Sequence, residues 1–143
     1  MKRTLPAIAA IFLLSLAVRA QDKPLPEYGD IGDLKGMSKV YVNADSTEAR
    51  KYILNRLKEY PSLKVVASPD EAEFFLDCAR NGHILTSSTL IPEMDTYEMT
   101  VYTINNGRHR IAWSRTKTSV RYAPTLLTGD FIGTLKKGLR PKN

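Results

Sequence analysis

The residues that most resemble a catalytic motif are Ser114-Arg115-Thr116-Lys117, which match the Ser-x-x-Lys pattern of penicillin-recognising enzymes. In those enzymes the Ser and the Lys meet because they lie one turn apart on a helix. Here the four residues belong to a β-prone stretch, in which alternation places Ser114 and Lys117 on opposite faces of a strand. The Ser-Asx-Asn and Lys-Thr-Gly partner motifs are also absent from the sequence. We therefore interpret the match as a coincidence of spacing.

Residues that bind metals are few in this sequence, which contains one Cys and two His. Cys78 and His83 together supply at most two ligands, whereas zinc sites use three or four. The acids around Asp30 lack the spacing and the bidentate Glu of a calcium loop. We expect no metal, no cofactor and no catalytic residue, and we predict that the protein is not an enzyme. A small hydrolase whose site is assembled only in three dimensions, around His83 or His109, is an alternative.

The basic residues within the body of the chain are the candidate contacts for an anionic or other partner. They are Arg108, Arg110, Arg115, Lys117 and Arg121. Strand alternation places Arg108 and Arg110 on the opposite face from Arg115 and Arg121, unless a bulge intervenes. We expect most of this stretch to be a solvated strand face. A binder of an anionic glycan or lipid is therefore an alternative function.

The chain has 143 residues, and its formal net charge of +6 arises at its two ends. The body from Gln21 to Leu135 contains 14 cations and 15 acids and is nearly neutral. This balance argues against a nucleic-acid partner, which needs a broad cationic face. A chain of this length can build one core without disulfides, so we interpret the single Cys78 as a buried small hydrophobe.

Residues 1–20 have the pattern of a signal peptide, in which Lys2 and Arg3 precede an acid-free apolar run over residues 5–18. Small residues permit a cut before Gln21 or three residues earlier. The run has about 14 residues, whereas a spanning helix needs roughly 20, and a retained anchor is the weaker alternative. We expect an exported protein, periplasmic or extracellular, with no transmembrane segment after cleavage.

The first elements that position these residues form a strand-helix-strand unit. Residues 39–43 predict a short strand, and Asp45 with Glu48 has the pattern of an N-cap with a capping box. The helix ends before Pro61, and residues 63–67 predict a second strand. The short crossover means that the two strands are parallel.

The middle of the chain predicts a helical turn and a strand. Residues 68–71 have a Ser cap, a Pro and two acids, which is typical of a short helical turn. Residues 74–79 predict a strand that buries Cys78, and residues 80–95 predict an irregular connection.

A β-hairpin is the strongest long-range signal in the sequence. Strands over residues 97–104 and 109–120 flank Asn106-Gly107, which suits a type I′ turn. A two-residue loop places three pairs opposite each other: Tyr102 and Ile111, Thr100 and Trp113, and Glu98 and Arg115. The last of these would be a cross-strand ion pair.

A closing helix capped by Thr128 completes the domain, with Phe131, Leu135 and Leu139 on one face. The predicted fold class is α/β (α+β). We expect a mixed sheet of about five strands in the order β-α-β-(short α)-β-β-β-α, with helices mainly on one face. The expected organisation is a signal peptide over 1–20, an extended lead-in over 21–38, one domain over 39–139 and a frayed tail over 140–143.

This layout resembles a family of exported α/β domains that includes the amino-terminal domain of the TolB translocation protein and curli-assembly and flagellar outer-membrane proteins. The resemblance rests on the acidic turn and strand of residues 70–76, on Gly107 with Trp113-Ser114 in the hairpin, and on Gly129-Asp130-Phe131. It covers residues 39–139 as element order. The chain departs from the family in a longer Gly107-to-Trp113 spacing and in having no lipoprotein Cys, and no functional residue is carried over.

The resemblance implies a non-catalytic envelope module for binding or assembly. We therefore expect an exported, non-enzymatic envelope protein with a protein partner. The expected contacts are the open edge of the sheet, which can accept another strand, and the lead-in.

Overall fold

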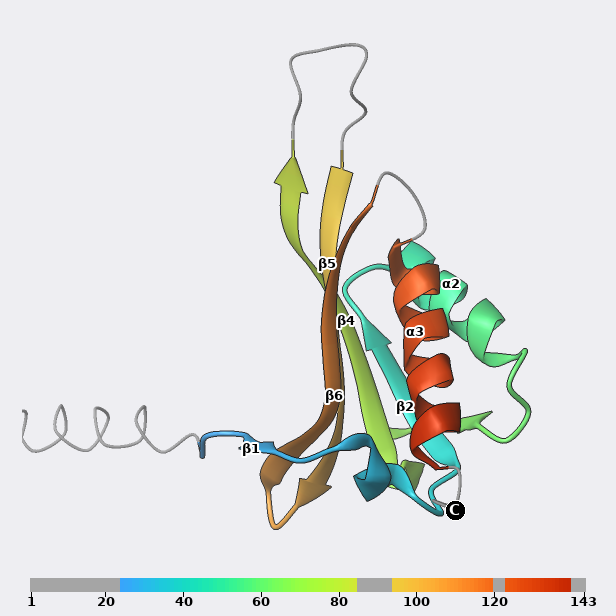
Figure 1. Ribbon diagram of the computed structural model, residues 1–143, viewed down its shortest axis with the longest axis vertical. Coiled ribbons are helices and arrows are strands. Elements are labelled where there is room, and N and C mark those ends of the chain that lie inside the picture. The colour runs from blue at the N-terminus through green and yellow to red at the C-terminus, as the bar shows by residue number, and fades with distance from the viewer. Residues whose placement is uncertain (1–23, 85–93, 120–122, 140–143) are drawn as a thin grey trace, which may run out of the picture.

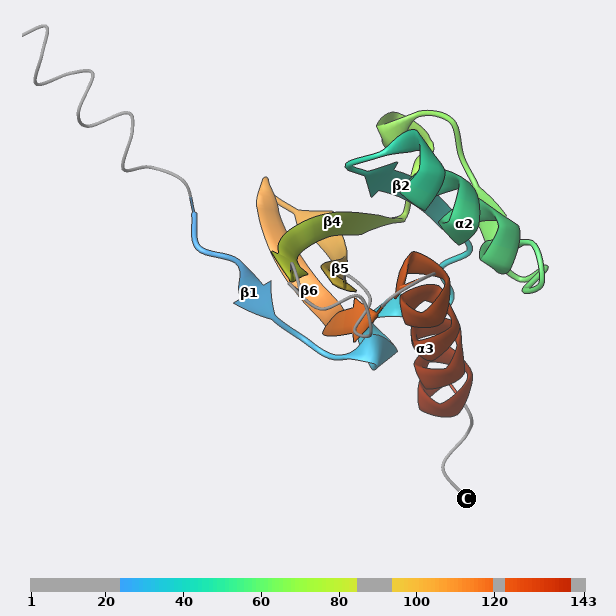
Figure 2. The same cartoon turned by 90° about the horizontal axis from the view of Figure 1, so that it is seen from above.

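The protein forms a six-stranded mixed sheet with two α-helices on one of its faces (Figures 1 and 2). The structure is a computed structural model that describes residues 24–84, 94–119 and 123–139. The elements in chain order are β1 (Glu27–Tyr28), the 3-10 helix η1 (Ile31–Leu34), β2 (Lys39–Ala44), α2 (Thr47–Leu57), β3 (Lys64–Val65), the 3-10 helix η2 (Pro69–Glu71), β4 (Phe74–Ile84), β5 (Met94–Asn105), β6 (Arg108–Ser119) and α3 (Ala123–Gly138). The strands are ordered β1-β6-β5-β4-β2-β3. The predicted α/β fold class is confirmed.

The strand-helix-strand unit forms as predicted, with β2 parallel to both β3 and β4. The helix cap differs by one residue, because Ser46 is the N-cap of α2 and its Oγ accepts from the Ala49 N–H at 3.1 Å. Asp45 instead accepts from the Arg80 N–H at 2.6 Å and so ties the helix start to β4. The predicted capping box between Asp45 and Glu48 is therefore wrong.

The core lies between the sheet and the two helices. Its fully buried side chains include Val40, Val42, Ile53, Leu57, Phe74, Leu76, Met99, Val101, Leu127, Phe131 and Leu135. The Phe131 ring lies 6.3 Å from Phe74 and 5.6 Å from Trp113, between ring centroids, so α3 is anchored over two separate strands. Cys78 is buried as predicted, and burial raises the pKa of its thiol to about 12.

The hairpin of β5 and β6 turns at Asn106-Gly107, whose φ angles of 51° and 74° fit the predicted type I′ turn. Tyr102 pairs with Ile111 as predicted. Beyond this pair the register shifts, because Ala112 has no partner and forms a β-bulge.

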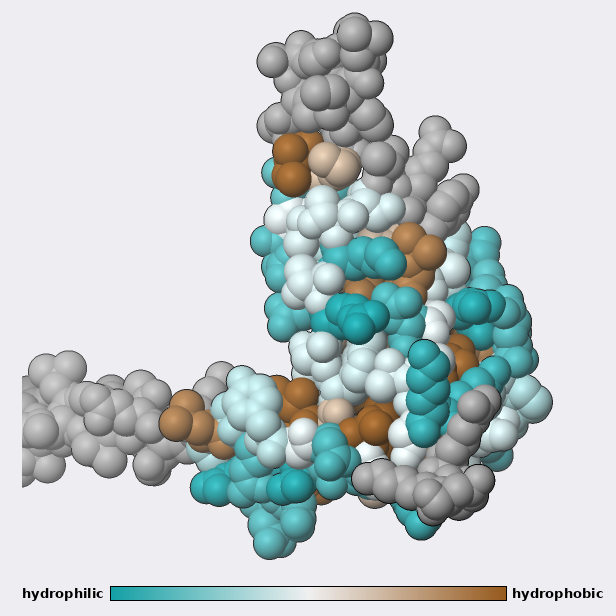
Figure 3. All heavy atoms as spheres, in the orientation of Figure 1, coloured by the Kyte–Doolittle hydropathy of each residue, from teal (hydrophilic) through white to brown (hydrophobic). Residues whose placement is uncertain are grey.

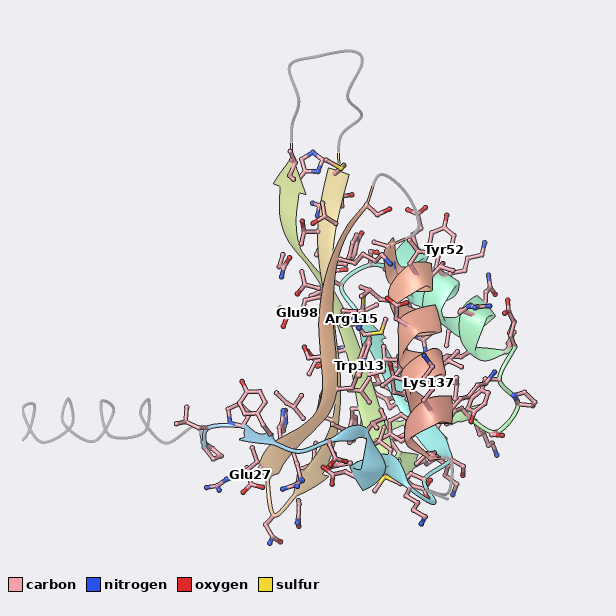
Figure 4. The ribbon with its side chains drawn as sticks, viewed as in Figure 1. Glu27, Tyr52, Glu98, Trp113, Arg115 and Lys137 are labelled. Carbon is pink, nitrogen blue, oxygen red and sulfur yellow. The ribbon has the colours of Figure 1, made fainter. Side chains whose placement is uncertain are left out.

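The bulge overturns the other two predicted pairs of the hairpin. Thr100 pairs with Ser114, and Glu98 pairs with Thr116. The predicted pairing of Glu98 with Arg115 is wrong, and Figure 4 shows these two side chains on opposite sides of the sheet. One extra residue in a strand exchanges the faces of every residue that follows it.

Strands β4 and β5 are longer than predicted. β4 continues to Ile84, and β5 begins at Met94, so both ends of the predicted irregular connection are strand. His83 and Asp95 pair across these ends, with Nδ1 and Oδ1 at 2.5 Å. Residues 85–93 of the predicted connection lie outside the described residues.

Helix α3 begins at Ala123, more than one turn before the predicted cap Thr128. Thr128 lies inside the helix and is fully buried, and its Oγ1 donates to the Pro124 carbonyl at 2.7 Å. This bond satisfies the hydroxyl within the helix, so Thr128 is not a cap. Pro124 lies in the first turn, where its missing N–H removes no helical hydrogen bond.

The lead-in contributes two elements that the sequence did not predict. β1 pairs in parallel with β6, which gives the sheet six strands rather than about five. η1 is capped by Asp30 and buries Leu34 in the core. The predicted signal peptide and the tail over 140–143 lie outside the described residues.

Within the described ranges, no helix combines the length and the apolar character that crossing a membrane requires.

Candidate functional site

The outer edge of β6 is the candidate site, because only part of it is paired. β1 pairs with Arg110 and Ile111 of β6, and the Gly29 N–H donates to the Ile111 carbonyl at 2.8 Å. From Ser114 to Ser119, no described strand lies beyond β6. In Figure 3 this part of the surface lies above β1 and is mostly hydrophilic. We call it the open half of β6.

The strand register shows which backbone groups face outward along the open half. The Asp45 N–H donates to the Cys78 carbonyl, so the backbone of Cys78 points toward β2. In an antiparallel pair, the backbone groups of two opposite residues either both point toward each other or both point away from each other. Cys78 points away from β5, so its partner Met99 points away from β4 and toward β6, where it lies opposite Arg115. The backbone of Arg115 therefore points inward to β5. The N–H and C=O groups that point outward belong to Ser114, Thr116 and Thr118.

The cations at the first half of β6 are held by acids of the lead-in. Arg108 Nη1 lies 2.9 Å from Glu27 Oε1, and Arg110 Nε lies 2.8 Å from Asp33 Oδ2. Hydrogen bonding from Arg108 holds the pKa of Glu27 below its ordinary value, and Arg110 does the same for Asp33. Figure 4 shows Glu27 on the strand that crosses β6. These pairs hold β1 and η1 against β6.

The cations of the open half are held by helix α3. Arg115 Nη1 and Lys117 Nζ lie 3.2 Å and 3.6 Å from Asp130 Oδ2. The Arg115 guanidinium also lies 5.9 Å from the centre of the Trp113 ring, and Figure 4 shows both side chains on the side of α3. Each of these two cations therefore faces a carboxylate.

The bulge at Ala112 brings the predicted contact residues to one face. Arg110 pairs with Thr103, Arg115 with Met99 and Lys117 with Tyr97, which are alternate residues of β5. Arg110, Arg115 and Lys117 thus share the face that carries the helices, with Arg108 two residues before Arg110. Arg121 lies outside the described residues.

The acidic partners were missed by the sequence analysis. Glu27, Asp33 and Asp130 are distant from β6 in the sequence, and no spacing rule links them to it. The sequence signal nearest to the bulge is Ile111-Ala112-Trp113, a run of three apolar residues in a strand that is otherwise polar. Such a run breaks the alternation expected of a half-buried strand, which a bulge also does.

The face of the sheet opposite the helices carries an aromatic row. Phe75 and Tyr102 stack at 5.4 Å, Tyr102 and His109 stack at 4.4 Å, and Tyr41 meets Phe75 edge-on at 6.3 Å. These are distances between ring centroids. The row rigidifies the sheet on the side that the helices do not cover.

Asp77 lies beside this row, and its Oδ2 accepts from the Tyr102 hydroxyl at 3.2 Å. Burial raises the pKa of Asp77 against the lowering effect of this bond, and it raises the pKa of Tyr102 to about 12. The Tyr102 hydroxyl is therefore a protonated donor at neutral pH and a poor nucleophile. Although His109, an acid and a hydroxyl meet here, the arrangement favours a structural bond over the hydrolase alternative.

Metal ligands do not gather in the part of the chain that the structure describes. No group of three or more His, Cys, Asp or Glu side chains has the geometry to hold an ion there. The sequence offered Cys78 and His83 as a pair of possible metal ligands. In the structure Cys78 lies in the core, whereas His83 is exposed at the surface.

Comparison with known proteins gives matches among solved structures only. No family model and no curated protein matches the chain. The PelC dodecamer from Paraburkholderia phytofirmans is 15% identical with a TM-score of 0.44, over 76% of this chain and 90% of that one. The lipoprotein GNA1162 from Neisseria meningitidis is 9% identical with a TM-score of 0.38, over 70% and 99% of the two chains.

A third similar structure is the hypothetical protein CT253 from Chlamydia trachomatis, which is 14% identical with a TM-score of 0.43, over 59% of this chain and 72% of that one. At such identities and TM-scores, these likenesses assign neither a family nor a function to the chain. The resemblance to TolB and curli-assembly proteins stays a prediction.

Proposed function

We propose that this protein is an exported, non-enzymatic envelope protein that binds another protein by accepting a strand at the open half of β6. The observation that carries the proposal is the outer edge of β6 from Ser114 to Thr118, beside which the structure places no strand among the residues that it describes. Strand addition gives affinity through main-chain hydrogen bonds. Export is supported by the signal-peptide pattern of residues 1–20.

The residues of the open half whose backbone groups point outward are not of the kinds with which proteins usually protect an edge strand. Such edges are blunted by charged side chains, by Pro or by bulges. Here the residues with outward backbone groups, Ser114, Thr116 and Thr118, are small and uncharged. The two cations of the open half are drawn to Asp130 on the helix side. A second strand therefore meets no charged barrier.

The first half of β6 already carries an added strand. β1 pairs there in parallel although it comes from the lead-in, and a partner strand would continue the sheet along the same edge. Each intermolecular bond contributes about 0.5–1.5 kcal/mol net. A partner that bonds to Ser114, Thr116 and Thr118 would gain this contribution at each bond, and side-chain contacts beside the added strand would supply the rest of its affinity.

The test compares Thr116→Pro with Thr116→Val in the full-length tagged chain, expressed in its own host and photo-crosslinked from position 118. Pro removes the outward N–H and blocks the approach of a strand, while the pairing of β6 with β5 is kept. Val keeps the N–H and the strand propensity. We expect one protein to be crosslinked in the wild-type and Thr116→Val chains, and its yield to fall roughly tenfold or more in Thr116→Pro.

A crosslinker at Lys137 of α3 is the positional control, since this residue lies on the helix layer (Figure 4). The proposal is wrong if the same protein is recovered equally with Thr116→Pro, or if it crosslinks from Lys137 and not from position 118.

A further inference from the structure

A groove lies between α2 and β3, at the end of the sheet farthest from β1. It forms because β3 extends the sheet beyond β2, over which α2 packs. Its volume is about 660 Å³, within the range of roughly 300–1,000 Å³ found for small-molecule sites. Its apolar lining consists of Leu54, Leu57, Leu63 and Val65. Leu54 and Val65 are only partly buried, so the groove exposes apolar surface.

The rim of the groove is cationic. Arg50, Lys51 and Lys58 line it, and none of the lining residues is acidic. Among the described residues, Lys51 and Lys58 have no carboxylate partner, in contrast to the cations of β6. Arg50 reaches the Val42 carbonyl with Nε at 3.4 Å and keeps its other donors. A concave apolar surface with a rim of one charge sign attracts ligands of the opposite sign.

The lining residues of α2 follow the whole length of that helix, from Thr47 to Lys58. At 1.5 Å per residue this side of the groove is about 16 Å long. An elongated apolar floor with cations along its rim matches a molecule that has a hydrocarbon chain and one anionic head. The guanidinium of Arg50 is suited to a carboxylate, which it can bind with two parallel N–H bonds.

We propose that this groove binds a single-chain anionic amphiphile, such as a free fatty acid. The hydrocarbon chain lies along Leu54, Leu57 and Val65, and the carboxylate lies at the cationic rim. The groove is separate from the open half of β6. The proposal of amphiphile binding therefore does not depend on the proposal of strand addition, and each can fail without the other.

The test titrates the full mature chain with monomeric sodium dodecanoate and follows the methyl NMR signals of Leu54, Leu57, Leu63 and Val65. We expect saturable shifts of these methyl groups. Dodecyltrimethylammonium, which has a hydrocarbon chain of nearly the same length and the opposite charge, should bind roughly tenfold more weakly.

The matched variants change the charge at two places by the same amount. Lys51→Glu/Lys58→Glu should weaken dodecanoate binding roughly tenfold, because the rim then repels the carboxylate. Lys35→Glu/Lys137→Glu removes two exposed cations elsewhere and should leave binding unchanged. Circular dichroism checks that both variants fold.

Three results would overturn the proposal. The first is the absence of saturable shifts in the groove methyl groups. The second is equal binding of the anionic and the cationic amphiphile, or equal effects of the two double variants. The third is a response to phosphatidylglycerol vesicles without a response to monomeric dodecanoate, which would assign the surface to a membrane.

Discussion

The two halves of β6 differ in what lies beyond them, although they belong to one strand. The first half is covered by β1 and held by Glu27 and Asp33 of the lead-in. The open half has no described neighbour at its outer edge, and Asp130 holds its cations from the helix side. The bulge at Ala112 separates the halves.

This difference shows how a short segment can pair with one part of a sheet edge and leave the other part without a strand among the described residues. The lead-in supplies a strand of two residues, so it satisfies only the first half. The acid that faces the cations of the open half, Asp130, lies on α3 and not on a strand beside the edge. In our proposal, these ion pairs draw Arg115 and Lys117 to the helix side, so that a partner strand can approach the edge.

The largest predicted effect comes from removing the side chain that holds α3 over β4 and β6. Phe131 is fully buried and contacts Trp113, next to the bulge. We predict that Phe131→Ala lowers the free energy of unfolding by about 3–5 kcal/mol, measured by urea denaturation. Leu126→Ala on the exposed side of α3 is the control and should change it by less than about 0.5 kcal/mol. A loss below about 1 kcal/mol for Phe131→Ala would contradict the packing described.

The next effect separates inward from outward backbone groups. Arg115→Pro removes an N–H that bonds to β5, and we predict a loss of about 3 kcal/mol or more in the free energy of unfolding. Thr116→Pro removes an outward N–H and should cost less than about 1 kcal/mol. Thermal and urea unfolding of both variants measure the difference. Equal losses would mean that the alternation assigned to the open half is wrong.

Much of the fold could be predicted because local patterns carry it. The alternation of Val40 and Val42, the Asn106-Gly107 turn and the spacing of Phe131 and Leu135 each lead to the element that forms. Boundaries were less predictable where tertiary contacts decide them. Asp45, for example, caps no helix because the Arg80 N–H occupies its carboxylate.

The site was less predictable than the fold, because it depends on contacts between distant segments. β1 has only two residues, and nothing in Glu27–Tyr28 indicates pairing with β6. A bulge was named from the sequence only as an exception to the alternation, and this bulge decides which face the later cations occupy. The carboxylate partners required the three-dimensional structure.

A smaller effect tests the ion pair of the first half. The pKa of Asp33 is lowered by its bond to Arg110, so this carboxylate stabilises the fold above its ordinary pKa of 3.8, and the contribution is lost as the pH falls through the lowered value. We predict that Asp33→Asn lowers stability at pH 7 by at most about 1 kcal/mol. The difference from the wild type should vanish in strong acid. Urea midpoints across pH 2 to 7 measure this, and a constant difference would contradict the pairing.

The smallest effect has the opposite sign and lies on the uncovered face. Burial raises the pKa of Asp77, so the folded state favours its protonated form, and stability falls as the pH rises from the ordinary value of 3.8 through the raised value. Asn keeps an acceptor for the Tyr102 hydroxyl. We predict that Asp77→Asn is as stable as the wild type or slightly more stable at pH 7. A clear loss in the same urea series would show that the charge is needed.

The most direct measurement of strand addition at the open half is residue-resolved amide hydrogen exchange, on the protein alone and in complex with its crosslink-identified partner. In the free protein, the amides of Ser114, Thr116 and Thr118 should exchange fast and those of Arg115 and Lys117 slowly. In the complex, the first three should become protected while the other two stay protected. Fast exchange of Ser114, Thr116 and Thr118 in the complex would contradict strand addition at this edge.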